Sequence, residues 1–161
     1  MSKILDFYMG TCTDDSGRTF KQVLSMTDDE FERSHDHIQF LFGSVEPSKA
    51  QPQSPVLTES DITEFKNNQC LRIMVLQATL RAIEFYTNTT RWLRPYDHNH
   101  LRITRILKFL MLVDQEEQAR GFLTWVLKQT ENIAIPENTE QFWILAVYPD
   151  IYERAAAFSG P

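Results

Sequence analysis

DHNHLRITRILK, residues 97–108, is the stretch of this 161-residue chain that decides its fold. Its apolar residues recur with the 3.6-residue period of an amphipathic helix, which we expect to start at Asp97 as N-cap and to reach about Val113. The inward sector is Ile103, Ile106, Leu107, Leu110 and Val113. His100, Thr104 and Lys108 fall on the opposite side, which we expect to face water.

A second stripe of this helix, His98, Arg102, Arg105 and Phe109, borders the core sector. A guanidinium beside a core is costly unless it is paired or hydrogen-bonded, so Arg102 and Arg105 are predicted to be mostly buried, each with a charge-assisted hydrogen bond. The expected partners are Glu46, Asp36, Glu84, or an anionic or carboxylate-bearing ligand.

The rest of the chain also has helical periodicity, and no alternating strand pattern is present. We expect an all-α fold, a compact bundle of six or seven helices with one long Pro-rich loop, forming a single domain over residues 1–161. We expect helices at residues 2–10, 27–42, 58–65, 68–86, 97–113, 116–128 and 139–148. Brief turns are expected from residue 19 and at residues 150–158.

The clearest helix start is Thr27-Asp28-Asp29-Glu30, a capping box. Its helix is expected to continue to Phe42, with Phe31, His35, Ile38 and Phe42 as one inward seam. The following loop, Gly43–Pro55 (GSVEPSKAQPQSP), has no hydrophobic period. We expect Val45, Pro47 and Val56 to order it by packing on the helices.

Composition excludes several classes of function. With 16 Lys and Arg against 22 Asp and Glu, the net charge of −6 makes nucleic-acid binding unlikely. Residues 1–30 lack a secretion signal, and no apolar run is long enough to span a membrane, so a cytoplasmic protein without membrane insertion is expected. Cys12 and Cys70 have no zinc spacing, and no cofactor motif is present.

Two triplets, His35-Asp36-His37 and His98-Asn99-His100, look like metal ligands. On one helix, however, residues two apart point about 160° away from each other, so neither triplet can aim both histidines at one ion. We therefore predict no metal site.

Several motifs resemble the conserved domain of the opioid growth factor receptor family. The most specific is His98–Lys108, and the supporting motifs are Asp6-Phe7-Tyr8, His35 with Ile38–Phe42, Glu46-Pro47-Ser48 and Leu57-Thr58. Phe40 and Gly43 stand where the family usually has Trp and Pro. The chain is expected to be a stand-alone, microbial member.

The resemblance implies an all-helical domain without established catalytic activity, which in animals is associated with a short opioid peptide and with growth control. It also implies importance for His35, Gln39, His98, Asn99, Arg102 and Arg105 in this chain. These six residues are our candidate ligand-binding residues.

Three interpretations of these residues stay open. They could fix the Pro-rich loop through internal contacts, form a pocket for a carboxylate or phosphate, or serve a small enzyme that acts on an anionic substrate with His98 as general base. We favour a binding or regulatory module for a small anionic or peptide ligand, or for a protein partner. The ligand is expected at the N-terminal end of the Asp97 helix, or farther along the arginine stripe if Asp97 occupies that end.

Overall fold

The computed structural model describes residues 2–49 and 51–151, which contain nine helices and no strand. The helices are α1 (Lys3–Tyr8), α2 (Phe20–Leu24), α3 (Asp28–Arg33), α4 (His37–Leu41), α5 (Glu59–Asn67), α6 (Gln69–Asn88), α7 (Asn99–Leu112), α8 (Glu116–Thr130) and α9 (Glu137–Val147). The prediction of an all-α fold is confirmed. The described residues contain nine helices rather than the expected six or seven, because the turn expected from residue 19 is a helix and the helix expected at 27–42 is divided in two. Of the expected final turn, residues 152–158 lie outside the described residues.

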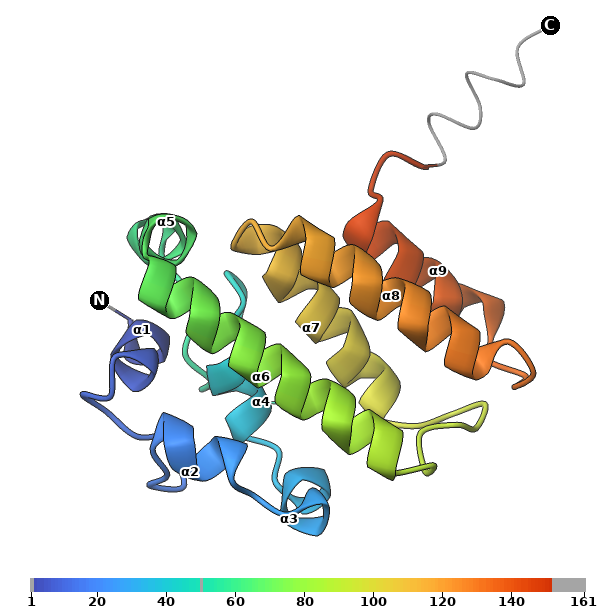
Figure 1. The fold of residues 1–161 in the computed structure, drawn as a ribbon, viewed down its shortest axis with the longest axis horizontal. Coiled ribbons are helices and arrows are strands. Elements are labelled where there is room, and N and C mark those ends of the chain that lie inside the picture. The colour runs from blue at the N-terminus through green and yellow to red at the C-terminus, as the bar shows by residue number, and fades with distance from the viewer. Residues whose placement is uncertain (1, 50, 152–161) are drawn as a thin grey trace, which may run out of the picture.

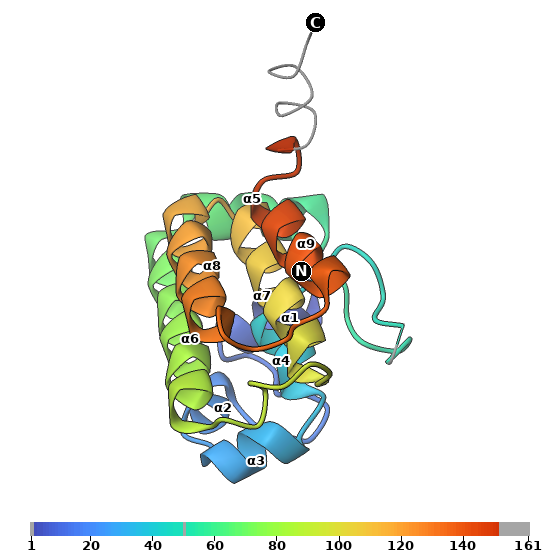
Figure 2. The same ribbon diagram turned by 90° about the vertical axis from the view of Figure 1, so that its right-hand side faces the viewer.

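Two groups contain seven of the nine helices of the described residues, and the short helices α1 and α4 pack on each other (Figure 1). The three helices α7, α8 and α9 pack on one another, while α6 packs against the shorter helices α2, α3 and α5. The long loop between α4 and α5 projects from the body beside α7 (Figure 2). Among the described residues, no helix combines the length and the apolar character needed to cross a membrane.

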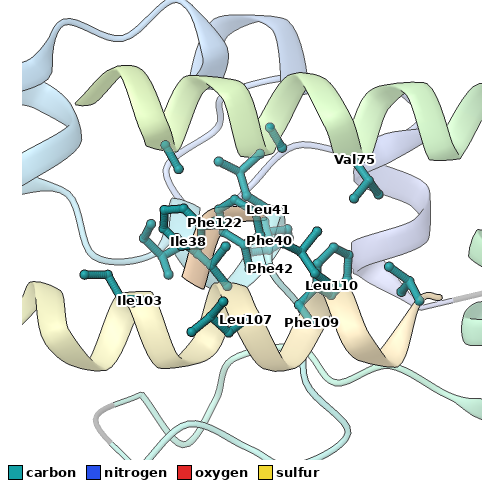
Figure 3. Close-up of a cluster of buried hydrophobic side chains, with 14 of the residues drawn as sticks. Ile38, Phe40, Leu41, Phe42, Val75, Ile103, Leu107, Phe109, Leu110 and Phe122 are labelled. Carbon is teal, nitrogen blue, oxygen red and sulfur yellow. The ribbon is translucent and has the colours of Figure 1, made fainter. Parts of the chain in front are cut away.

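Aromatic side chains from distant segments fill the core between α4, α6 and α7 (Figure 3). Phe40 and Phe42 of the α4 region are fully buried, and the ring of Phe42 lies 5.9 Å from that of Phe109 in α7. Tyr8 of α1 donates a 2.6 Å hydrogen bond to the carbonyl oxygen of Leu41. The core therefore joins the N-terminal short helices to α7.

The single helix predicted from Thr27 to Phe42 is wrong. The capping box at Thr27 forms, but α3 ends at Ser34, which has extended backbone, and α4 begins at His37. Asp36 accounts for the break, because it accepts hydrogen bonds from Ser16, Arg18 and Ser34. Burial alone would raise the pKa of Asp36, but these hydrogen bonds and the Arg18 charge hold it below its usual range.

The break also changes which histidine is buried. His35, expected on the inward seam, is exposed, and His37 is completely buried against the ring of Phe31. The two segments have different helical phases, so a seam counted through a continuous helix assigns the wrong residue to the core.

The expected water face of α7 is partly covered. His100 is only 5% exposed because α9 packs over it, and Trp143 of α9 donates its indole N–H to the His100 carbonyl oxygen at 3.1 Å. The His100 ring places Nε2 2.9 Å from the carbonyl oxygen of Trp92, so this nitrogen carries the proton. The prediction that His100 faces water is therefore wrong.

Of the three residues predicted to order the Pro-rich loop, Val56 is partly buried and the other two are exposed. Val45 is 53% exposed and Pro47 is also exposed, so neither anchors the loop. Leu57 is buried instead, and its N–H donates to the Ser44 carbonyl oxygen at 2.8 Å, which ties the two ends of the loop together. Ser54 is buried and accepts from the N–H of Ser48.

Gly43 starts this loop where the core leaves no room for a side chain. A Cβ at Gly43 would lie 2.8 Å from Ile4 Cδ1 and 2.9 Å from Leu57 Cδ1. We expect Gly43→Ala to lower the free energy of unfolding by about 1–3 kcal/mol through overpacking. The control is Gly121→Ala in α8, where nothing lies within 4 Å and better helix propensity should add about 1 kcal/mol. Urea unfolding measures both, and equal stability of the two variants would contradict the packing at Gly43.

Burial of His37 gives stability a pH dependence. Burial lowers its pKa to about 3, assisted by the charges of Arg102 and Arg18. Below pH about 6.5 the unfolded chain binds a proton at His37 and the folded chain does not, so stability should be complete above that pH and fall as the pH drops toward 3. Between pH about 6.5 and about 5 the loss should be about 2 kcal/mol.

Urea unfolding at the two pH values tests this expectation with His37→Phe, which keeps a ring of similar size. The variant should lose about 2 kcal/mol less than the wild type over this interval, because it has nothing to protonate. Arg91→Gln is the control, since Arg91 is exposed and all four histidines stay in place, so this variant should keep the wild-type slope. An unchanged slope in His37→Phe would show that other groups cause the pH dependence.

Candidate functional site

A pocket of about 560 Å³ lies between α4, α7 and the Pro-rich loop. It is lined by His35, Ile38, Gln39, Ser48, Lys49, Gln51, His98, Leu101, Arg102 and Arg105. Five of the six candidate binding residues line it, and Asn99 does not. The break between α3 and α4 brings His35 near His98, with ring centres 5.9 Å apart.

Arg102 forms one wall of the pocket but uses most of its hydrogen-bonding capacity internally. Its guanidinium donates to the carbonyl oxygens of Phe31 (3.2 Å), Glu32 (3.3 Å) and Ser34 (2.7 Å), and also to His35 Nδ1 at 3.2 Å. The side chain is 8% exposed. The prediction of a buried, hydrogen-bonded Arg102 is confirmed, but its partners are mainly backbone carbonyls rather than the expected Glu46, Asp36 or Glu84.

Helix α7 begins at Asn99 with His98, rather than the predicted Asp97, at its N-cap position, and Asp97 contacts the first turn from one residue farther out. Asp97 Oδ1 accepts from the backbone N–H of Asn99 at 2.9 Å and from its side-chain nitrogen, also at 2.9 Å. Asp97 Oδ2 accepts from Arg94 Nε at 2.8 Å. Burial opposes ionisation of Asp97, but these hydrogen bonds keep its pKa below the usual range. Asp97 therefore occupies this helix end with its own carboxylate, and the alternative prediction, a ligand farther along the arginine stripe, is the one that this geometry favours.

Asn99 is a buried connector. Besides Asp97, its side-chain nitrogen donates to Glu32 Oε2 at 3.1 Å, and its side-chain oxygen accepts from Arg102 at 3.4 Å. Glu32 also lies 3.3 Å from His98 Nε2. Asn99 thus holds Glu32 beside the arginine and the histidine without reaching the pocket surface.

Gln39 also supports the local backbone. Its amide is best oriented with the nitrogen donating to the carbonyl oxygens of His35 and Asp36, the latter at 3.0 Å. This arrangement ties the Gln39 side chain to the segment just before α4 and fixes the side of the pocket on which His35 lies. Across the described ranges, no group of three His, Cys, Asp or Glu side chains is placed to hold a metal ion.

Arg105 differs from Arg102 in having unused donors. Its Nε donates to the Phe42 carbonyl oxygen at 2.7 Å, and its Nη2 is buried without a hydrogen-bond partner in the part of the chain that the structure describes. No carboxylate of the described residues lies within ion-pair distance of it. Burial lowers the pKa of Arg105. The predicted burial and hydrogen bond are confirmed, and Nη2 is left without a partner among the described residues.

Lys49 is the pocket cation that the sequence analysis missed. It comes from the Pro-rich loop and lines both this pocket and an adjoining groove of about 500 Å³ that also includes Arg105 and Lys108. The available signal was that Lys49 is the one basic residue between Gly43 and Pro55. Helical periodicity could not predict that Lys49 lines the pocket, because side chains of a loop do not repeat on one face.

One similarity to a curated protein accompanies this geometry. The chain is 27% identical to the opioid growth factor receptor of Mus musculus over 169 aligned positions, which cover 89% of this chain and 26% of that protein. The chain therefore spans about a quarter of that protein's length, and the two are distantly related over this region. No family model matches the sequence. No solved structure matches it either.

Loss of Arg102 should destabilise the fold because three carbonyl acceptors lose their donor at once. We expect Arg102→Ala to lower the free energy of unfolding by about 3–5 kcal/mol and Arg102→Lys by about 1–3 kcal/mol, since an ammonium cannot span the same carbonyls. Urea unfolding at neutral pH measures both. Arg91→Ala, at an exposed position, is the control and should change stability by less than about 0.5 kcal/mol. If Arg102→Ala also lowered the free energy of unfolding by less than about 0.5 kcal/mol, the expectation would be contradicted, because water would then replace the guanidinium as donor to the three carbonyls.

Proposed function

We propose that residues 1–161 form one binding domain that holds the carboxylate or phosphate group of a small or peptide ligand in the pocket between α4, α7 and the Pro-rich loop. The observation that carries this proposal is the Arg105 guanidinium, which has a buried nitrogen without a partner among the described residues. A buried donor without a partner costs free energy, and an anion would remove that cost. A guanidinium can also bind an oxyanion through two parallel hydrogen bonds.

The other pocket residues support an anion joined to an apolar group. Lys49 adds a second cation from the loop, while Ile38 and Leu101 supply apolar surface. Among the described residues no Asp or Glu lines this pocket, and Glu32, which lies close to His98 and Arg102, accepts a hydrogen bond from Asn99. The pocket interior is therefore locally basic in a chain whose net charge is −6.

The distant relative supports a binding-type domain and nothing finer. Its name describes a receptor for an opioid growth factor, and this chain corresponds to about a quarter of that protein. We carry over only the class of function, since similarity of sequence or fold does not fix a ligand.

A small enzyme is the second candidate because His98 lies 3.3 Å from Glu32 and is 42% exposed beside the pocket. A carboxylate can orient a histidine that acts as a general base. Turnover of an anionic substrate such as p-nitrophenyl phosphate, abolished in His98→Gln and retained in Arg91→Gln, would favour this candidate.

The binding proposal is tested by titrating inorganic phosphate, citrate and N-acetyl-leucine into the protein and following the melting temperature and the NMR signals of pocket residues. At least one of these should raise the melting temperature, because ligand at 100 times its dissociation constant stabilises by about 2.7 kcal/mol. Arg105→Gln should weaken that binding about tenfold or more through loss of charge-assisted hydrogen bonds.

Arg91→Gln is the matched control, since it removes one exposed positive charge away from the pocket lining. It should leave the dissociation constant within about twofold. Equal weakening in both variants would mean that only the overall charge matters. Absence of binding by all three anions would contradict the proposed function.

A further inference from the structure

Helix α6 carries a stripe of exposed apolar side chains on the face that points away from the core. Ile73 is 48% exposed, Leu76 40% and Leu80 55%, and Ile83 beside them is partly exposed. In Figure 2 this helix runs along the outer edge of the molecule. Single exposed leucines are ordinary on protein surfaces, but a continuous stripe of this kind marks an interaction surface.

The spacing of the stripe is that of a coiled-coil seam. Ile73, Leu76, Leu80 and Ile83 follow one another at intervals of three, four and three residues, which is the a and d pattern of a heptad. The opposite side of α6 is already used, since Leu71, Val75, Ala78 and Ala82 are fully buried in the core. The helix therefore has a second apolar face that the described residues leave uncovered.

The order of residues in the stripe is a palindrome. Read in either direction it is Ile-Leu-Leu-Ile, centred on residue 78. A two-fold axis at residue 78 would place Ile73 opposite the partner's Ile83 and Leu76 opposite the partner's Leu80. A symmetric dimer needs such a self-complementary patch, because each contact occurs twice with the partners exchanged.

Charged residues at the two ends of the stripe, Arg72 and Glu84, also fit an antiparallel pair. On this axis Arg72 of one copy comes level with the partner's Glu84, so opposite charges share each end of the contact. A parallel pair would instead bring Arg72 level with the partner's Arg72. The middle of the surface carries uncharged side chains, among them Gln77. The rim therefore favours the antiparallel arrangement.

We propose that α6 is a homodimerisation surface on which a second copy of this chain packs antiparallel, with Leu76 and Leu80 at its centre. Stable dimers commonly bury about 800 Å² per partner, and contact through one helix provides less than that. The dimer is therefore weak, with a dissociation constant on the order of 10–100 µM. This inference is independent of the proposed ligand pocket, which lies on α4 and α7.

Sedimentation equilibrium over about 5–200 µM protein tests the proposal. The wild-type chain should pass from monomer to dimer over this range, and Leu80→Glu should raise the dissociation constant at least tenfold, because it places a carboxylate opposite the partner's Leu76. Leu101→Glu is the matched control, since Leu101 is 76% exposed on α7 and outside the stripe. Circular dichroism and the melting temperature check that each variant folds.

Cross-linking with a short bis-maleimide tests the orientation. On the proposed axis two copies of residue 77 lie about 3 Å apart along the helix direction, and two copies of residue 70 about 24 Å apart. In a Cys12→Ser background, Gln77→Cys combined with Cys70→Ser should therefore cross-link, and the exposed native Cys70 should not. A wild-type chain that stays monomeric at the highest concentration, a dimer insensitive to Leu80→Glu, or efficient Cys70 cross-linking would overturn the proposal.

Discussion

The hydrogen bonds from the Arg102 guanidinium to three backbone carbonyls are the interaction on which the rest of the structure depends. They join α7 to a segment 68–71 residues earlier, where α3 ends and α4 begins. At a helix end, carbonyl oxygens lack partners within the helix, and one planar guanidinium supplies several donors to them. The same bonds set the place of His35, and through it one side of the pocket.

The two arginines of α7 have divided roles although they lie three residues apart on one stripe. Arg102 points at the free carbonyls of a helix end and is saturated by them. Arg105 meets one carbonyl, that of Phe42, and keeps a buried nitrogen without a partner among the described residues. One arginine therefore holds the architecture, while the other carries the nitrogen that the proposed ligand would satisfy. A structural and a ligand-binding interpretation of the stripe thus concern different residues of it.

The periodicity of α7 and the helix caps were readable from sequence because they depend on local chemistry. The capping boxes at Thr27 and Thr58 and the Asn68 cap all form within three residues of their partners. The inward sector of α7 is buried as predicted, from Ile103 to Val113. The four misplaced side chains, those of His35, His100, Val45 and Pro47, each depend on how a distant segment packs or fails to pack against them.

The sequence by itself determined that the chain is all helical, where most helices start, and that Arg102 and Arg105 would be buried with hydrogen bonds. These follow from hydrophobic period, capping groups and the cost of an unpaired buried charge, all of which act within one helix. Only the tertiary structure decided that α3 and α4 separate at Ser34, that α9 buries His100, and that Lys49 reaches the pocket. Each of these depends on contacts between segments far apart in sequence, including the bonds of Asp36 to Ser16 and Arg18 and of Trp143 to His100, and no local pattern encodes such contacts.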